Sequence, residues 1–217
     1  MRDFPVFTTE NGVASIVLKE VPYKGIAYIT IQDSLAPAEL LKECVAFAQM
    51  AGAQHIYATG HKVLEAYPLY TAVLKMSRSR EGIQESDCAL FPVTEKTKIK
   101  WQSLYNEKMK TVSNASTMTN EDMEKLLSRG GGYFIHKDGE LLGIGIAFGD
   151  TVESVIAAKP GAGREVMLAL CSSLFSERIV LEVASANGRA VRLYENLGFI
   201  ATAELSRWYD VLTRKNT

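Results

Sequence analysis

Residues 152–197 alternate between strand and helix patterns, with glycines at the first change from strand to helix. Residues 152–158 and 179–183 are short apolar runs rich in β-branched residues, which predicts strands. Residues 187–197 predict a helix, and so do residues 163–175, whose apolar residues share one helix face: Val166, Met167, Leu170, Cys171, Leu174 and Phe175. This order of elements predicts an α/β fold.

The N-terminal part of the chain shows a similar order of patterns. Residues 25–31 and 55–59 predict strands, 38–51 an amphipathic helix, and 64–76 a helix interrupted near Pro68. Residue identity with the later pattern is low, and the turn after the first strand has no glycine. We therefore interpret the N-terminal part as a smaller α/β unit, a degenerate and partial copy of the C-terminal one.

The polar stretch 77–88 marks the expected domain boundary, which divides the chain into domains of residues 1–86 and 87–217. The expected elements of the second domain also include a strand at 89–93, a helical region from Thr94 to Met109, a helix from Thr119, strands at 133–136 and 141–148, and a closing hairpin of 200–203 and 207–212. Thr119 and Asp122 have the spacing of a capping box. Asp138-Gly139, between two apolar runs, is a strong hairpin signal.

Charge and composition exclude several classes of partner. The chain has 24 Lys and Arg against 25 Asp and Glu, a formal net charge of −1. Nucleic acids and anionic membranes require a basic patch, and the short run of Lys96, Lys98 and Lys100 is interpreted as a solvated helix face. We therefore expect neither a nucleic acid nor a membrane as a partner.

The use of cysteine and the absence of long apolar runs indicate a cytoplasmic protein. Cys44, Cys88 and Cys171 are scattered and form no Cys-x-x-Cys pair, which argues against a disulfide framework or a zinc site. No apolar run approaches the ~18 residues of a membrane span, and no signal-peptide pattern is present. No cluster of His and carboxylate residues has the spacing of metal ligands.

Residues 161–164, Gly-Ala-Gly-Arg, lie between a predicted strand and a predicted helix. Glycine lets the backbone approach a ligand closely, and the first N–H groups of a helix are unsatisfied and favour an anion such as pyrophosphate. Arg164 adds a possible charge-assisted hydrogen bond. A tight turn without a ligand explains the same residues, and the full Gly-x-Gly-x-x-Gly fingerprint of dinucleotide binding is absent because residue 166 is Val.

The predicted helix at 187–197 carries a second group of candidate residues. Asn187 is placed to cap the helix or to contact a ligand amide, and Ala190 is small enough to allow close approach. Tyr194 lies two turns after Asn187, so its phenol is a candidate proton donor to a leaving thiolate. Core packing by Tyr194 and a plain helix end at Gly198 are the alternative.

The pattern Asn187-x-x-Ala190-x-x-x-Tyr194-Glu195-x-x-Gly198-Phe199 resembles the C-terminal motif of the GCN5-related N-acetyltransferases (GNAT). The turn with Gly161 and Gly163 resembles the pyrophosphate loop of that family, and residues 89–217 follow the family's order of elements. The resemblance implies an α/β (α+β) fold with a mixed, splayed central sheet and acetyl-CoA bound between the strands at 152–158 and 179–183.

The same resemblance implies roles for individual residues. Backbone groups of Ile156, Ala157 and Ala158 would bind the pantetheine arm, and the backbone of Gly161, Ala162, Gly163 and Arg164 would hold the pyrophosphate. Asn187 and Ala190 would contact the cofactor or position their helix, and Tyr194 would protonate the CoA thiolate. The family's loop is longer, however, because Lys159-Pro160 lead directly into Gly161 here, and Pro160 has no N–H to donate.

The general base is not identified by a motif. Glu153, at the start of the splayed strand, is the first candidate, and His136 is the second. No Gly-x-Ser-x-Gly or paired Cys and His arrangement suggests covalent catalysis, and the GNAT resemblance implies direct attack of an amine on the thioester.

The resulting hypothesis is an N-acetyltransferase that moves an acetyl group from acetyl-CoA to an amine whose identity the sequence leaves open. A non-catalytic CoA-binding or regulatory module is the main alternative, and a structural α/β protein with an empty cleft is a third. A homodimer formed through the C-terminal strands is possible under each hypothesis.

Overall fold

The computed structural model describes residues 5–213, which form two compact units. The first unit contains the residues up to Val73 and those from Glu204 onward, and the second is Leu74–Ala203. Strands β5 (Leu69–Ser79) and β11 (Ile200–Asp210) pass from one unit into the other. The domain boundary predicted at 86/87 stays a prediction.

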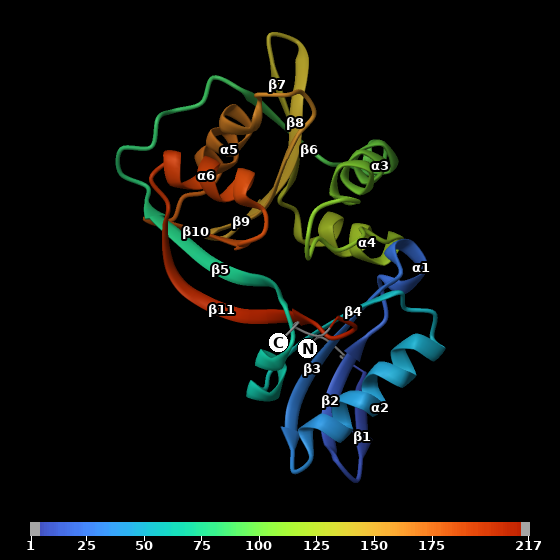
Figure 1. The fold of residues 1–217 in the computed structure, drawn as a ribbon. Helices are drawn as coiled ribbons and strands as arrows, with labels where there is room; N and C mark the ends of the chain where they lie inside the picture. The colour runs from blue at the N-terminus through green and yellow to red at the C-terminus, as the bar shows by residue number, and fades with distance from the viewer. Residues whose placement is uncertain (1–4, 214–217) are drawn as a thin grey trace. The chain divides into compact units, whose positions relative to one another are not determined.

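The first unit is a sheet with one helix against it (Figure 1). Its strands lie in the order β1-β2-β3-β4-β11. The bounds are β1 Val6–Thr9, β2 Gly12–Val17, β3 Ile26–Ser34 and β4 His55–Thr59, with the short helix α1 Val21–Lys24, the helix α2 Pro37–Met50 and a 3₁₀ turn at Lys62–Ala66. The β1–β2 and β2–β3 pairs are antiparallel, and β3–β4 is parallel with α2 as the crossover.

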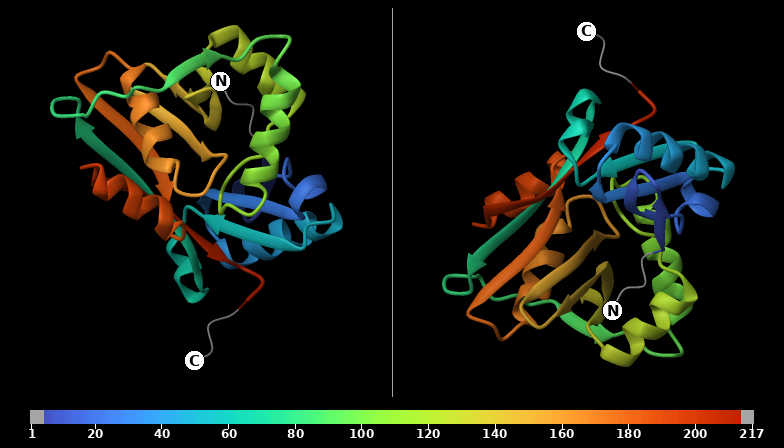
Figure 2. Two further views of the ribbon diagram at one scale, coloured as in Figure 1. Left: turned by 90° about the horizontal axis from the view of Figure 1, so that it is seen from above. Right: turned by 90° about the horizontal axis from the view of Figure 1, so that it is seen from below.

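The second unit is a mixed sheet covered on both faces (Figures 1 and 2). Its strands lie in the order β5-β10-β9-β8-β7-β6. The bounds are β6 Ala89–Pro92, α3 Lys98–Met109, α4 Asn120–Arg129, β7 Gly132–Lys137, β8 Glu140–Phe148, β9 Thr151–Ala157, α5 Gly163–Ser172, β10 Arg178–Ala184 and α6 Gly188–Asn196. This architecture confirms the predicted fold class, a mixed α+β fold with a curled sheet of parallel and antiparallel strands.

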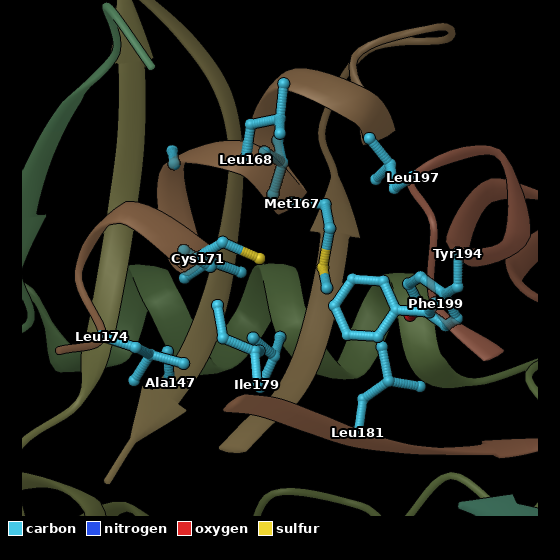
Figure 3. Close-up of a cluster of buried hydrophobic side chains, with 14 of the residues drawn as sticks. Ala147, Met167, Leu168, Cys171, Leu174, Ile179, Leu181, Tyr194, Leu197 and Phe199 are labelled. Carbon is cyan, nitrogen blue, oxygen red and sulfur yellow. The ribbon is translucent and has the colours of Figure 1, made fainter. Parts of the chain in front are cut away.

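Two apolar clusters hold the helices of the second unit against its sheet. The first joins α5 and α6 to the sheet through Met167, Cys171, Leu181 and Phe199, among others (Figure 3). The second joins α3 and α4 to the opposite face through residues that include Trp101, Met123, Ile144, Ile146 and Ile156. The helices therefore fix both faces of β8 and β9.

The close approach of α5 to the sheet depends on glycines in β8. A Cβ atom on Gly145 would lie 2.4 Å from Leu170 Cδ1 and 2.7 Å from the Ser154 carbonyl oxygen. A Cβ atom on Gly143 would lie 2.7 Å from Val166 Cγ2. Only glycine leaves room at these two positions for α5 to pack directly on the strand.

Local signals in the sequence correctly predicted several element ends. Thr119 Oγ1 accepts a hydrogen bond from the Asp122 N–H, and the Asp122 side chain accepts one from the Thr119 N–H, which completes the predicted capping box. Asp138 and Gly139 have φ values of 50° and 78°, the left-handed conformation that a tight two-residue hairpin turn requires.

The helix predicted at 64–76 is wrong. A short 3₁₀ turn covers Lys62–Ala66, and β5 begins at Leu69, directly after Pro68. Tyr70, Thr71 and Val73 favour a strand by their side-chain shapes, and the neighbouring strands β10 and β11 supply the hydrogen bonds that make it one. The parallel between the two halves therefore stops before this element.

The closing hairpin predicted at 200–203 and 207–212 is also wrong, because Ile200–Asp210 is one continuous strand. The residues between the two predicted strands, Glu204, Leu205 and Ser206, include no Gly, Pro, Asn or Asp to form a turn. Tyr209 pairs with Ala58 of β4 at the far end of the strand.

The two units share an order of elements and of pairing. In the first, β1-β2-β3 is antiparallel and α2 leads to β4, parallel to β3. In the second, β7-β8-β9 is antiparallel and α5 leads to β10, parallel to β9. The third strand has a bulge in both units, at Gln32 in β3 and at Glu153 in β9. The shared order runs up to β4, and the degenerate repeat itself stays a prediction.

Candidate active site

The strands β9 and β10 separate soon after they meet. Their pairing consists of Thr151 with Val180 and Val152 with Leu181, and no further pair follows within the described residues. In the first unit, by contrast, β3 and β4 pair from Ile26 and His55 through to the end of β4. The edge of β9 after Val152 therefore faces no neighbouring strand on the β10 side.

A β-bulge lies at the point of separation. Ser154 pairs with Ile146 and Val152 pairs with Ala147, so Glu153 is the extra residue of β9. A bulge bends its strand and increases the local twist. The bulge at Glu153 therefore gives a physical reason for β9 to turn away from β10 immediately after Val152.

The free edge of β9 presents backbone groups of alternate residues. The Ala158 N–H donates to the Leu142 carbonyl at 2.8 Å, so Ala158 is directed toward β8. Because backbone groups alternate in direction along a strand, Ile156 also faces β8, whereas Val155 and Ala157 face the free edge. Of the predicted pantetheine contacts at Ile156, Ala157 and Ala158, the geometry favours Ala157, with Val155 in addition.

The turn at 161–164 leads into α5 as predicted. Gly161 has φ 86° and no atom lies within 4 Å of the position its Cβ would take, so the space around it is open. Ala162 is the N-cap, with no side-chain cap hydrogen bond, and Gly163 is the first residue of α5. As in any helix, the first-turn N–H groups have no intrahelical acceptor, and here no side chain of the N-cap accepts from them. The helix dipole also favours an anion at this end.

Arg164, the cation predicted for this turn, already has a protein partner. Its Nη2 donates to Gln84 Oε1 at 3.1 Å, and Gln84 belongs to the segment 80–88 that runs along the α5 side of the second unit (Figures 1 and 2). Nearby, Lys137 Nζ lies 3.1 Å from Asp87 Oδ2 and 3.0 Å from Glu165 Oε1. The segment is therefore tied to the N-terminal turn of α5 by polar contacts.

Asn187 caps α6 as predicted. Its Oδ1 accepts a hydrogen bond from the Ala190 N–H at 3.2 Å, which satisfies one of the first N–H groups of the helix. Ala190 packs against the apolar cluster of α5 and α6. Leu193, one turn further, approaches Gly163, whose Cβ would lie 3.3 Å from Leu193 Cδ2. The motif helix therefore lies directly beside the glycine turn.

Tyr194 lies in the core between α6 and the sheet (Figure 3). The residue is 8% exposed, and its ring centroid is 6.2 Å from that of Phe199. Burial, with a smaller contribution from Cys171, raises the pKa of Tyr194 to about 12. The phenol is therefore protonated at neutral pH, as a proton donor must be. The ring of Tyr194 also packs in the core, which is the role that the alternative to a catalytic tyrosine predicted.

The two candidate bases occupy different settings. Glu153 accepts two hydrogen bonds from Arg129 at the end of α4, at 2.7 Å and 2.5 Å. The two side chains remain partly exposed, at 39% for Arg129 and 36% for Glu153. His136 of β7 instead packs edge-on against Phe91, with 5.2 Å between ring centroids. Glu153 lies at the point where β9 leaves β10, and His136 lies two strands away.

The sequence did not single out Arg129, Gln84 or Ser154, which the structure places around this edge. Arg129 is the last residue of α4, where a cation is common because it interacts favourably with the helix dipole. Only its contact with Glu153, which is distant in the sequence, distinguishes Arg129 from other residues at helix ends. Gln84 lies in the stretch interpreted as a linker. A serine in a strand carries no signal of its own.

Within residues 5–213, the first unit has no open edge equivalent to that of β9. Gly60, which follows β4, approaches β3 so closely that its Cβ would lie 2.2 Å from the Ile31 carbonyl oxygen. At the N-terminus of α2, Pro37 has no N–H to donate. The features that suggest an anion site are therefore specific to the second unit.

No group of three or more His, Cys, Asp or Glu side chains within residues 5–213 is arranged to hold a metal ion. Among the same residues, no helix is both long enough and apolar enough to cross a membrane.

Comparison with known proteins identifies the fold. No protein-family model and no curated protein matches the sequence. A GCN5-related N-acetyltransferase from Kribbella flavida matches the structure with a TM-score of 0.58 at 14% identity, covering 97% of this chain and 90% of that chain. One from Anabaena variabilis matches with a TM-score of 0.59 at 13% identity, covering 91% and 58%.

A conserved protein of unknown function from Staphylococcus epidermidis matches equally well, with a TM-score of 0.58 at 12% identity over 96% of this chain and 93% of that chain. These identities are too low to carry an activity or a substrate from one protein to another. The agreement in structure does confirm the resemblance that the motif around Tyr194 predicted. The chain has the fold of the GCN5-related N-acetyltransferases.

Proposed function

We propose that this protein is an acetyl-CoA-dependent N-acetyltransferase, which moves the acetyl group to an amine by direct attack. The observation that carries the proposal is a pair of neighbouring features. The edge of β9 is free beyond Val152, and an open glycine turn follows the C-terminal end of β9 and leads into the N-terminus of α5. An extended arm with amide groups fits the first feature, and a pyrophosphate fits the second.

In this proposal the residues of the turn, Gly161, Ala162, Gly163 and Arg164, bind the pyrophosphate through backbone N–H groups and the guanidinium. The pantetheine arm follows the free edge of β9 and pairs with backbone groups of Ala157 and Val155. Asn187 and Ala190 hold α6 against the turn. The loop is short, and Pro160 supplies no N–H, so these few donors and the helix dipole carry the binding.

The chemical step requires one base and one acid. The amine nitrogen attacks the thioester carbonyl, the carbon–sulfur bond breaks, and the CoA thiolate leaves. Glu153 takes the proton that the amine nitrogen loses, and Tyr194 donates a proton to the thiolate. Although Glu153 accepts from Arg129, each carboxylate oxygen has a second lone pair that remains available.

A non-catalytic CoA-binding module is the second candidate, and one observation favours it. Tyr194 is 8% exposed and packed among apolar side chains, so little of its surface is open to a leaving thiolate. If this packing keeps the phenol away from the sulfur, the fold binds CoA without assisting its departure.

Calorimetric titration of acetyl-CoA into the protein and two variants tests the cofactor site. Arg164→Glu places a carboxylate on an exposed position of the first turn of α5 without disturbing the core, whereas Gly163→Glu would crowd Leu193, whose Cδ2 would lie 3.3 Å from the new Cβ. Lys100→Glu, exposed on α3, makes the same change of charge elsewhere in the second unit. We expect micromolar binding to the wild type and to Lys100→Glu, and at least a tenfold loss in Arg164→Glu.

A lack of binding to the wild type would show that the fold has abandoned the cofactor. Equal loss in Arg164→Glu and Lys100→Glu would place the anion elsewhere. Where binding is confirmed, release of the CoA thiol in the presence of primary amines separates the two candidate functions, since a binding module gives none.

A further inference from the structure

Ser154 has a buried hydroxyl without a hydrogen-bond partner among residues 5–213. The residue is 7% exposed. Its neighbours on the same face are Ile146, paired directly across from it, and Ile156, two residues along β9, and both belong to the apolar cluster of α3 and α4. A buried hydroxyl that makes no hydrogen bond lowers stability, so its presence calls for an explanation.

The position of Ser154 suggests that explanation. Glu153 is the bulge and Val152 makes the last pair with β10, so Ser154 is the first residue beyond the point of separation. Val155 and Ala157 direct their backbone groups toward the free edge. An arm that pairs with these groups and runs from Ala157 toward the bulge reaches Ser154 after about 10 Å of strand, where the closed β9–β10 pair stops it.

The group at the end of such an arm determines what Ser154 can contact. In an acyl-CoA, the arm ends in a thioester, whose carbonyl oxygen accepts hydrogen bonds, whereas free CoA ends in a thiol. A serine hydroxyl has one hydrogen to donate, and rotation about χ1 moves it between staggered positions. The unpartnered hydroxyl beside the end of the free edge therefore matches a carbonyl oxygen, which only the acylated form supplies there, because the sulfur of free CoA is a weak acceptor.

We propose that the Ser154 hydroxyl donates a hydrogen bond to the carbonyl oxygen of the acyl group and so distinguishes acyl-CoA from free CoA. This inference rests on the proposed function, because it needs a CoA arm on the β9 edge. The same contact strengthens as the oxygen gains negative charge during attack by the amine, and it weakens when free CoA is left to dissociate.

The test compares the affinities for acetyl-CoA and for CoA by calorimetry in the wild type and three variants. Ser154→Ala removes the donor, and Ser154→Cys keeps the shape with a weaker donor. Ser128→Ala is the control, because its hydroxyl is on α4 and donates to the Lys125 carbonyl. We expect the wild type and Ser128→Ala to bind acetyl-CoA about fivefold to tenfold more tightly than CoA.

In Ser154→Ala we expect this preference to fall to about one, with the affinity for CoA unchanged within twofold, and in Ser154→Cys to be intermediate. The Tm of Ser154→Ala should equal or exceed that of the wild type, because the variant removes a buried hydroxyl that has no partner. A purely structural role for the hydroxyl would instead lower the Tm.

Three results would overturn the inference. An unchanged preference in Ser154→Ala would show that the hydroxyl does not contact the acyl group, and equal losses for both ligands would show that it only shapes the edge. Both results leave the proposed function standing. Failure of the wild type to bind either ligand would overturn the proposed function together with the inference.

Discussion

Arg129 and Glu153 form a two-point ion pair in which Arg129 Nη1 lies 2.7 Å from Glu153 Oε1 and Nη2 lies 2.5 Å from Oε2. The pair joins the end of α4 to the bulge in β9. The Arg129 guanidinium carbon also lies 5.6 Å from the centre of the Phe148 ring, at the end of β8. The side chain proposed as the base is thus held by its own unit at the point where β9 separates from β10.

The first prediction distinguishes a catalytic from a structural role for Glu153. Glu153→Gln should lower kcat by about 100-fold or more, because a general base of this kind contributes at least that factor. Arg129→Gln breaks the same ion pair and retains the carboxylate, so it should keep most of kcat. Both variants should lose about 1 kcal/mol or less of unfolding free energy, since the pair is partly exposed. A Glu153→Gln variant with normal kcat would remove this residue from the mechanism.

The second prediction concerns stability in alkali. Burial raises the pKa of Tyr194 to about 12, against about 10 in the unfolded chain. Because the unfolded state loses its proton first, the contribution of this residue is complete below pH 10 and is lost as the pH rises from 10 to 12. We expect the Tm to fall more steeply over this range in the wild type than in Tyr194→Phe, measured by circular dichroism. Identical pH dependence in the two proteins would contradict the burial of the phenol.

The third prediction tests the close packing of α5 on β8. Gly145→Ala should lower the unfolding free energy by about 1–3 kcal/mol, because the new methyl group would lie 2.4 Å from Leu170 Cδ1. Gly188→Ala is the control, with 4.0 Å to the nearest atom, Arg192 Nη2, at the first residue of α6. It should be neutral or stabilising by up to about 1 kcal/mol. Urea denaturation measures both, and equal effects would argue against the tight contact.

The fourth prediction concerns the hydrogen bond between Arg164 and Gln84. If Arg164 binds the pyrophosphate, the Gln84 amide oxygen competes for its guanidinium. Gln84→Ala should therefore tighten acetyl-CoA binding by about twofold to tenfold, and Gln84→Glu, which offers a charged competitor, should weaken it. Calorimetry measures both constants, and the same direction of change in the two variants would exclude competition as the cause.

The parts of the fold that were predictable are those with a local physical cause. The capping box of Thr119 and Asp122, the turn at Asp138-Gly139 and the cap at Asn187 each depend on residues within a few positions of one another. The helix faces follow from spacing, but α5 ends at Ser172, so Phe175, which was predicted on its apolar face, is 92% exposed. The order of strands and helices around these signals predicted the fold class, and together with the motif around Tyr194 it predicted the resemblance that the comparisons confirmed.

The errors and omissions concern strands and their partners. Leu69–Ser79 is a strand because β10 and β11 lie beside it, and Ile200–Asp210 is one strand although it was predicted as two. The bulge at Glu153 exists only in relation to Ala147 and Ile146 of β8. Strand pairing joins residues that are distant in the chain, so a window of sequence contains little information about it.

The candidate site divides in the same way. The glycine turn before α5 and the motif helix with Asn187 and Tyr194 were identified from residue types and spacing, since a helix start and a capped helix are local structures. The free edge of β9, the contact of Arg129 with Glu153 and the unpartnered hydroxyl of Ser154 depend on which surfaces meet when the sheet closes. The sequence specified the glycine turn and the motif helix through local propensity, whereas long-range strand pairing and burial determined where β9 and β10 separate.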